Sequence, residues 1–386
     1  GGRPLIRAEW NINFNITINF PSVDVATIGA GGGSIARVDT GGVLKVGPES
    51  AGARPGPACY RQGGEAPTVT DANLVLGRLG ADTKLAGRVA LGLDLAQTAV
   101  DQVAGPLGCS RDEAAAGILS IMRANMAGAI RLMTVRRGHD PREFALAAFG
   151  GAGPLHALEL AKELGIPEVV IPYVPGLGSA LGVLSVDVRH DFVQSIFATN
   201  SRFDVTEIND AFADLEARAY GRLTEEGVSD DRVALHRQVD VRYYGQVSGG
   251  LTLDAGKDKL AEEDVRAIFD SFHEKHTEEY GYTLPADLAE LELVNARVSA
   301  EGAQSAPAAP VFAGATNGEA RPSSTRQVYF ELAGWTETVV YQRDTLPVGS
   351  KIAGPAVIEQ LDSTTLVIPG SSIEVDPRRN LICRVG

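Results

Sequence analysis

A glycine-rich loop at residues 27–34, with the sequence TIGAGGGS, follows the short run VDVA at residues 23–26. Glycine has no Cβ and readily adopts positive φ, so successive backbone N–H groups of such a loop can turn toward one anion. We therefore predict a phosphate-binding loop, in which the serine hydroxyl adds one more polar group. A tight turn without any ligand explains the same residues and stays open as the alternative. The candidate ligand residues are Gly29, Ala30, Gly31, Gly32, Gly33 and Ser34.

The residues after this loop exclude the two most familiar phosphate loops. A P-loop needs Gly-Lys-Ser or Gly-Lys-Thr, which is missing here. The dinucleotide fingerprint needs a third glycine where Ser34 stands, and then a helix. Residues 35–39 and 43–46 instead alternate around a turn at 40–42, which predicts a β-hairpin. A glycine loop that leads into a hairpin resembles the arrangement in actin-like kinases.

A second glycine cluster, GGAGP at residues 150–154, follows the apolar run 144–149. A helix with an apolar side is predicted from Pro154 until Gly165 ends it. The first turn of a helix has unpaired N–H groups, and the helix dipole favours an anion there. Two such loops together predict a nucleotide cleft, although close backbone packing also explains the second one. The candidate residues are Gly150, Gly151, Gly153 and His156, the last of which either contacts nucleotide or satisfies the helix end.

Several longer segments resemble the hydantoinase A and 5-oxoprolinase family, and the resemblance covers nearly the whole chain. The similar segments are 27–36, 46–60, 67–77, 140–142, 148–157, 176–182, 189–191, 241–246, 280–282 and 354–359. The family includes N-methylhydantoinases, 5-oxoprolinases, caprolactamase-like enzymes and ATP-using subunits of acetone and acetophenone carboxylases.

The resemblance implies an α/β fold of the actin and sugar-kinase superfamily, with ATP and Mg²⁺ as cofactors. ATP would phosphorylate the oxygen of a cyclic amide or imide (a hydantoin, 5-oxoproline or a lactam) before ring-opening hydrolysis. In the carboxylases it would activate a ketone enol and bicarbonate. A partner subunit of the hydantoinase B type usually completes the reaction. A nucleotide-free scaffold that binds its partner subunit is the alternative from another class.

One departure from the superfamily pattern concerns the early phosphate loops of the Asp-Gly-Gly-Thr type, neither of which occurs here. The residues GGRP at 1–4 resemble the point just after the second of them. We therefore expect the chain to be the C-terminal part of a subunit, the second half-domain of an actin-like fold. ATP is then expected to bind only when the N-terminal half is present as a partner.

Composition restricts the class of protein further. A length of 386 residues with 44% hydrophobic residues predicts several domains with ample core. The net charge of -14 argues against nucleic acid as a partner. No apolar run approaches the roughly 20 residues that cross a bilayer, and no secretory leader is visible. The three cysteines lack disulfide or zinc spacing, and we expect Cys59 to be buried rather than nucleophilic. A cytoplasmic location is expected.

The pattern of elements changes three times along the chain. Residues 1–190 alternate strands and helices, which predicts the α/β nucleotide-binding half-domain. Residues 191–302 contain two amphipathic helices and flanking strands, which predicts an α+β domain. Residues 303–324 are rich in Ala, Pro, Gly and Ser and are predicted to be a linker. Residues 325–386 are predicted to form a small β-rich module.

The candidates for acid/base chemistry are Asp71, Glu49 and Arg54, and the last two lie in the loop at 46–60. Asp71 either binds a magnesium-coordinated water or caps the helix that begins beside it, and we favour the cap. No metal ligands are nominated, because His273 and His276 lie on a highly charged segment that is expected to be solvated. His190 and Asp191 are neighbours on a predicted strand, so their side chains are expected on opposite faces.

Overall fold

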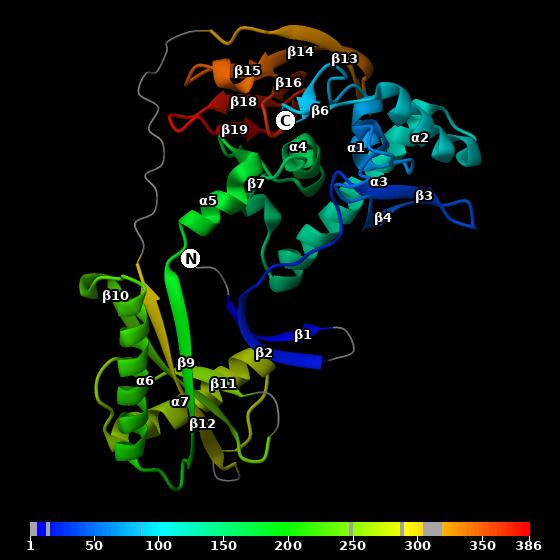
Figure 1. Ribbon diagram of the computed structural model, residues 1–386. Helices are drawn as coiled ribbons and strands as arrows, with labels where there is room; N and C mark the ends of the chain where they lie inside the picture. Colours follow the sequence, from blue (N-terminus) through cyan, green and yellow to red (C-terminus); the bar gives the residue numbers. More distant parts are fainter. Residues whose placement is uncertain (1–5, 13–15, 86, 247–249, 286–288, 304–318) are drawn as a thin grey trace. The chain divides into compact units, whose positions relative to one another are not determined.

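The computed structural model describes residues 6–12, 16–85, 87–246, 250–285, 289–303 and 319–386. The chain forms two compact units, of which the first combines Gly1–Ala180 with Ala308–Gly386 and the second is Leu181–Pro307 (Figure 1). Most of the predicted linker lies outside the described residues. The predicted α+β domain, 191–302, falls inside the second unit.

Among its described residues, the first unit has two multi-stranded sheets and the helices α1 to α4. One sheet has the order β15-β18-β19-β8-β7 and the other β13-β14-β16-β17, and both are mixed because β7 and β8, and β14 and β16, are parallel. The strands of the two sheets are β7 (Ala145–Ala147), β8 (Glu168–Ile171), β13 (Ser324–Phe330), β14 (Gly334–Gln342), β15 (Lys351–Ala353), β16 (Ala356–Glu359), β17 (Thr364–Val367), β18 (Ser372–Val375) and β19 (Leu381–Arg384).

The helices and small hairpins of this unit come mostly from its first 180 residues. The helices are α1 (Val69–Val75), α2 (Leu93–Leu107), α3 (Arg111–Met133) and α4 (Gly153–Leu164), and α5 (Gly178–Leu184) lies where the units join. The two-stranded pairs are β1 (Ile6–Ile12) with β2 (Ile16–Val23), β3 (Ser34–Val38) with β4 (Leu44–Ser50), and β5 (Lys84–Leu85) with β6 (Val89–Ala90). The β3-β4 pair is antiparallel, so the hairpin predicted after the first glycine loop is confirmed.

The sequence predicts that residues 325–386 form a module of their own. In the structure these strands belong to the first compact unit instead. Strand β19 pairs antiparallel with β8, with Cys383 opposite Val169. These two residues are buried in one hydrophobic cluster that also contains Ile118 of α3. Pairing between segments so far apart leaves no local pattern in the sequence, so the strands are visible there but their partners are not.

Helix α3 illustrates how local residues set an element. Ser110 and Glu113 have the Ser-x-x-Glu spacing of a capping box and form one, in which each side chain accepts the other residue's backbone N–H. By length and composition alone, Arg111–Arg137 is apolar enough to cross a bilayer, which was not expected from the sequence. Its residues Ile118 and Met122, however, are buried in the core of the first unit, as in a core helix of a globular protein.

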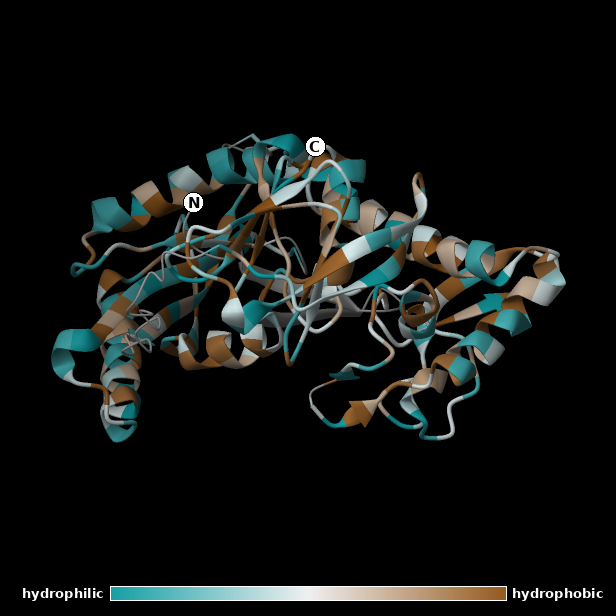
Figure 2. Ribbon diagram, turned by 90° about the horizontal axis from the view of Figure 1, so that it is seen from above, coloured by the Kyte–Doolittle hydropathy of each residue, from teal (hydrophilic) through white to brown (hydrophobic). Residues whose placement is uncertain are grey.

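The second unit is a four-stranded antiparallel sheet, in the order β11-β10-β12-β9, packed against two helices. Its elements are β9 (Val188–Thr199), α6 (Val205–Glu225), β10 (Val233–Tyr243), β11 (Leu251–Asp254), α7 (Glu262–Tyr280) and β12 (Leu291–Gly302). The predicted apolar stripes of both helices, which include Phe212 and Phe272, are buried in its core. Figure 2 shows teal and brown positions mixed along the helices, as amphipathic helices require.

Two predictions about histidines have different outcomes in this unit. His190 contacts Glu226 of α6 at 2.9 Å, whereas Asp191 pairs with Arg189 and Ser299, so the alternation along β9 is confirmed. The solvation expected for His276 is wrong, because its side chain is fully buried. Its Nδ1 donates to the carbonyl oxygen of Tyr282 at 2.8 Å. Neighbouring aromatic rings cover it, which the charges on the same helix do not reveal.

Candidate functional site

The first glycine loop is closed by its own serine. The N–H of Gly31 donates to Ser34 Oγ at 3.0 Å, and that hydroxyl donates to the carbonyl oxygen of Gly29, also at 3.0 Å. Ser34 is 2% exposed. Its hydroxyl group is therefore used inside the loop and is not free to bind an anion, contrary to the sequence-based expectation. Gly29 has a φ of +59°, and a Cβ there would lie 2.9 Å from the Cβ of Pro48, so only glycine fits.

Three backbone donors of this loop have no acceptor within the part of the chain that the structure describes. They belong to Ala30, Gly32 and Gly33, which all keep partial exposure to solvent. The carbonyl oxygen of Gly32 is fixed, since it accepts from both the N–H and the Oγ1 of Thr70, at 2.9 and 2.8 Å. The loop is thus held by α1 through the Gly32 carbonyl group.

The second glycine loop has the strand-turn-helix form that the sequence predicts. Strand β7 ends at Ala147, and α4 begins at Gly153 with Pro154 in its first turn. The N–H of Gly150 donates to Pro175 O at 2.7 Å, so this residue is not a donor toward a ligand. The N–H groups of Gly151, Ala152 and Gly153 have no acceptor among the described residues, and no side chain caps the helix. An uncapped helix N-terminus with free N–H groups favours an anion.

The two loops meet in space. A Cβ built on Gly32 would lie 3.8 Å from the Cβ of Ala152, which is ordinary van der Waals contact. Both loops belong to the first compact unit, so their contact does not depend on the second. Neither Gly32 nor Ala152 is fully buried, and no hydrophobic side chain separates them. Six backbone N–H groups without an acceptor among the described residues therefore lie on two loops that touch.

The turn between β16 and β17 contacts the second loop from the C-terminal part of the chain. Ser363 Oγ donates to the carbonyl oxygen of Gly151 at 3.2 Å. Asp362 accepts the N–H of Gly176 at 2.8 Å and the amide of Gln360 at 2.6 Å. A Cβ on Gly176 would lie 2.5 Å from the Asp362 carboxylate, so this close approach requires glycine. The turn holds the backbone around the second loop in place.

Asp71 is a structural cap and is not exposed at this site. Its Oδ2 accepts the N–H and the Oγ1 of Thr68, at 2.9 and 2.7 Å, which completes a capping box on α1. The N–H groups of Ala58 and Cys59 donate to the two oxygens of the same carboxylate. Because Asp71 is fully buried, the favoured cap is the role that the structure shows. Both of its oxygens accept hydrogen bonds from Thr68, Ala58 and Cys59, so the structure gives no support to a magnesium-coordinated water at this carboxylate.

Glu49 and Arg54 lie on the segment beside the first loop, where the Ala51 N–H donates to Gly33 O at 2.8 Å. Glu49 pairs with Arg37 at 3.1 Å and is largely exposed. Arg54 is exposed and has no polar partner among the described residues. Neither side chain is held in place by packing. Both remain candidates only by their position on this segment.

His156 lies in the second turn of α4 and is 2% exposed. Burial, and next the positive charge of Arg78, lower the pKa of its imidazole to about 4. Its Nε2 has no hydrogen-bond partner among the described residues, and it caps no helix end. The structure therefore shows no helix-end cap by His156, and the burial of its ring leaves little surface for a nucleotide. The neutral ring packs beside a buried ion-pair cluster instead.

Cys59 is fully buried, with 0% accessible surface. Burial, and next the nearby Asp71 carboxylate, raise the pKa of its thiol far above the ordinary value. A nucleophilic cysteine needs the opposite shift. The predicted packing role is confirmed.

Comparisons with known proteins place this geometry in a family. The family model described as hydantoinase/oxoprolinase matches residues 2–192, and the model described as hydantoinase/oxoprolinase C-terminal domain matches residues 198–382. The chain belongs to the hydantoinase/oxoprolinase family. Both glycine loops lie in the segment matched by the first model, and the β16-β17 turn that holds the second loop lies in the segment matched by the second.

The relatives are longer proteins of this family. An uncharacterized protein of Methanocaldococcus jannaschii is 41% identical over 363 residues, which are 93% of this chain and 50% of the relative. The caprolactamase subunit alpha of Pseudomonas jessenii is 37% identical over 366 residues, with 93% and 52% covered. This chain thus spans about half the length of these curated relatives.

Two solved structures of the family have the same fold over 99% of this chain. The ATP-dependent caprolactamase of Pseudomonas jessenii superposes with a TM-score of 0.77 at 35% identity, and 55% of that chain is covered. A nucleotide-free acetone carboxylase superposes with a TM-score of 0.80 at 27% identity, again with 55% covered.

Sequence reasoning missed several residues that shape the site in this family member. Thr70 lies in one of the segments that resemble the family. Its place in the first turn of a capped helix is a local signal for a hydroxyl group that can bond to a neighbouring loop. Asp362 and Ser363 had no signal, since their partners Gly176 and Gly151 lie far away in the sequence. Within the described residues, no three His, Cys, Asp or Glu side chains gather to hold a metal ion.

Proposed function

We propose that this chain is the ATP-binding part of an ATP-dependent cyclic amidohydrolase of the hydantoinase/oxoprolinase type. The observation that carries the proposal is the contact between the loops of Gly32 and Ala152. Together these loops have six backbone N–H groups without an acceptor among the described residues. Such a cradle of main-chain donors at a helix N-terminus fits the phosphates of a nucleotide. Relatives named as an ATP-dependent caprolactamase and as 5-oxoprolinases support the choice of ATP and of a cyclic amide.

The residues of this chain would bind and orient the phosphate groups. The amides of Ala30, Gly32 and Gly33 would hold them from one side, and those of Gly151, Ala152 and Gly153 from the other. Bound ATP would supply the phosphoryl group that turns a poorly reactive amide oxygen into a leaving group. Fixed backbone dipoles suit this task, because phosphoryl transfer depends on positioning and on charge stabilisation. We assign no Mg²⁺ ligand to the chain, since no described cluster of side chains fits one.

The complete site is proposed to need more protein than this chain. The relatives have about twice its length and several are named as subunits. We therefore propose that an N-terminal half and a hydantoinase B-type subunit act with it, and that the first unit is the second half-domain of an actin-like fold. A cytoplasmic location belongs to the same proposal.

A second function, ATP-dependent ketone carboxylation, is supported by one specific observation. The acetone carboxylase structure superposes slightly better than the caprolactamase structure, with TM-scores of 0.80 and 0.77. Sequence identity favours the amidohydrolase, at 35% against 27%. We therefore put the hydrolase first.

The test is ATP turnover by the complete enzyme, purified with its partner subunit. Lactams, hydantoins and 5-oxoproline are assayed in parallel with acetone and acetophenone plus bicarbonate. ADP release coupled to ring opening supports the hydrolase, and release coupled to bicarbonate-dependent carboxylation supports the second function. Absence of ATP binding and turnover in the complete enzyme would leave only the scaffold. Calorimetry on this chain alone is expected to show no tight ATP binding, whereas the complete enzyme binds it.

A further inference from the structure

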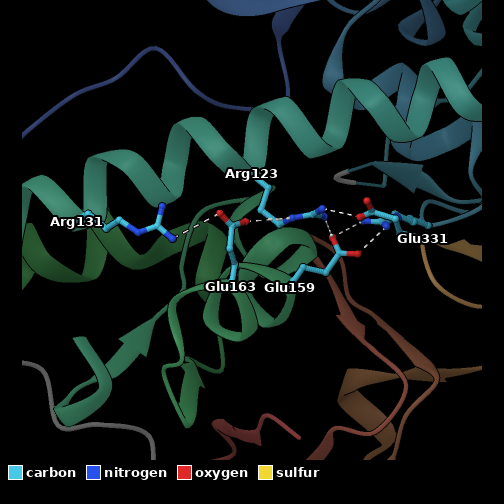
Figure 3. A network of polar contacts seen from close by, with 6 residues as sticks. Arg123, Arg131, Glu159, Glu163 and Glu331 are labelled. Atoms are coloured by element: carbon cyan, nitrogen blue, oxygen red, sulfur yellow. Dashed lines mark hydrogen bonds and ion pairs between the residues drawn. The ribbon is translucent and has the colours of Figure 1, made fainter. Parts of the chain in front are cut away.

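A buried ion-pair cluster lies where α4 packs against α3 (Figure 3). At its centre, both carboxylate oxygens of Glu159 accept from the guanidinium of Arg78, each at 2.8 Å. The Nη1 of Arg123 donates to the same carboxylate at 3.1 Å. The side chains of Glu159, Arg78 and Arg123 are 12%, 3% and 13% exposed. Two-pronged charged contacts away from water hold their partners in one geometry, and they are costly to break.

This cluster connects α4, which begins in the second glycine loop, with the segment after α1, the helix that contacts the first glycine loop. Arg78 follows α1 closely, and Thr70 in the first turn of the same helix holds the Gly32 carbonyl. Glu159 lies in the middle of α4, whose first residue, Gly153, belongs to the second loop. The ion pair between Arg78 and Glu159 therefore connects the segment that follows α1 with the middle of α4.

Arg123 of α3 connects Glu159 to a third part of the first unit. Its Nη2 donates to Glu331, in the turn between β13 and β14, at 2.6 Å. Its Nε lies 3.5 Å from Glu163, which also faces Arg131 at 3.9 Å. Glu159 thus lies between Arg78, just after α1, and Arg123 of α3. Buried charged networks favour one arrangement of the elements they join. In this network Arg78 Nε is the buried atom that has no hydrogen-bond partner among the described residues.

We propose that Glu159 is a positioning residue: by gripping Arg78 and Arg123 it sets α4 against α1, so that the N–H groups of both glycine loops face the same phosphates. This inference rests on the proposed ATP-binding function. Glu159 itself does not touch the ligand. Its role requires both its charge and its length, because a shorter carboxylate cannot reach both arginines from the same helix position.

The test uses the complete enzyme with Glu159→Asp and Glu159→Gln, and Glu163→Gln as the matched control. Asp keeps the charge and shortens the side chain, whereas Gln keeps the length and removes the charge. Glu163 lies one turn further along α4 and contacts the same Arg123, but it makes no contact with Arg78. Two quantities are measured: amide hydrogen exchange without nucleotide, and the KM values for ATP and for the cyclic amide. Thermal unfolding checks that each variant is folded.

Both Glu159 variants are expected to speed exchange of the hydrogen-bonded amides in the peptides that cover 27–34 and 148–154, which are those of Gly31, Ser34, Ala148 and Gly150. They should raise the KM for ATP by about tenfold to a hundredfold, the scale expected when binding groups shift by roughly 1 Å. The KM for the cyclic amide and the Glu163→Gln enzyme should stay as in the wild type. The proposal is overturned if Glu159→Asp behaves as wild type, or if exchange rises throughout the first unit instead of in the two loops. If the loops respond but the wild-type enzyme uses no ATP, the proposed function fails and the positioning of the loops stands.

Discussion

The backbone of Gly32 lies against Ala152, so the loop after β2 and the loop before α4 touch where neither has side-chain bulk. A Cβ on Gly32 would lie 3.8 Å from that of Ala152 but only 2.7 Å from Thr70 Oγ1. The second distance is too short for real contact, and Thr70 is already bonded to the Gly32 carbonyl. A side chain at position 32 would therefore have to displace the Thr70 hydroxyl group.

Replacing Gly32 with Ala is expected to push Thr70 aside and to separate the loops. Overpacking of this kind costs about 1–3 kcal/mol, and the thermal midpoint should fall accordingly. Gly31→Ala is the matched control, because a Cβ there meets nothing within 4 Å and its φ is not positive. Scanning calorimetry of both variants checks the prediction, and equal midpoints for the two would contradict it.

The buried capping box of α1 should tolerate less change than the exposed box of α3. In Asp71→Asn, the new amide must face an N–H donor at one of the two oxygen positions, both of which now accept hydrogen bonds. An unsatisfied buried donor costs about 1–3 kcal/mol. Glu113→Gln makes the same chemical change in the exposed box, and it should alter stability much less. Urea unfolding of both variants gives the comparison, and a stable Asp71→Asn protein would show that the carboxylate is not needed as a cap.

Asp362 should hold the second loop through the turn at 175–177. In Asp362→Ala, the Gly176 N–H loses its acceptor, and the Gln360 amide loses one of two acceptors and keeps the carbonyl oxygen of Tyr173. We expect faster amide exchange in residues 148–153 and 173–178, and a loss of stability of about 1 kcal/mol for the lost hydrogen bonds. Glu374→Gln on β18, whose side chain is half exposed, serves as the control. Unchanged exchange around Gly176 in Asp362→Ala would show that the turn is held by other contacts.

Elements that depend on neighbouring residues could be predicted from the sequence. The β3-β4 hairpin, the Ser110–Glu113 box and the buried stripe of α6 with Phe212 each follow from local spacing, and the structure confirms them. Both glycine loops were found in the same way, because positive φ and helix starts leave local signals.

Features that depend on distant partners could not be predicted. The pairing of β19 with β8 and the contact of Asp362 with Gly176 join segments that share no pattern. Burial also depends on distant elements, so the residues next to His156 and His276 in the sequence do not reveal that both side chains are buried. Each looks polar and accessible among its neighbours in sequence, whereas packing from other elements excludes water from both.

The buried imidazole of His156 should make stability depend on pH in a defined range. Its pKa is lowered from the usual 6.5 to about 4, first by burial and next by Arg78. Above pH 6.5 the ring is neutral in both the folded and the unfolded chain. As the pH falls toward 4, the unfolded chain takes up a proton that the folded protein refuses, so stability is lost on acidification. The loss is at most about 3 kcal/mol, since one pKa unit corresponds to about 1.4 kcal/mol. His156→Gln removes this titration, so its unfolding midpoint should change less between pH 6.5 and 4 than that of the wild type. Thermal unfolding at several pH values checks it, and parallel pH profiles for the two proteins would contradict the assignment.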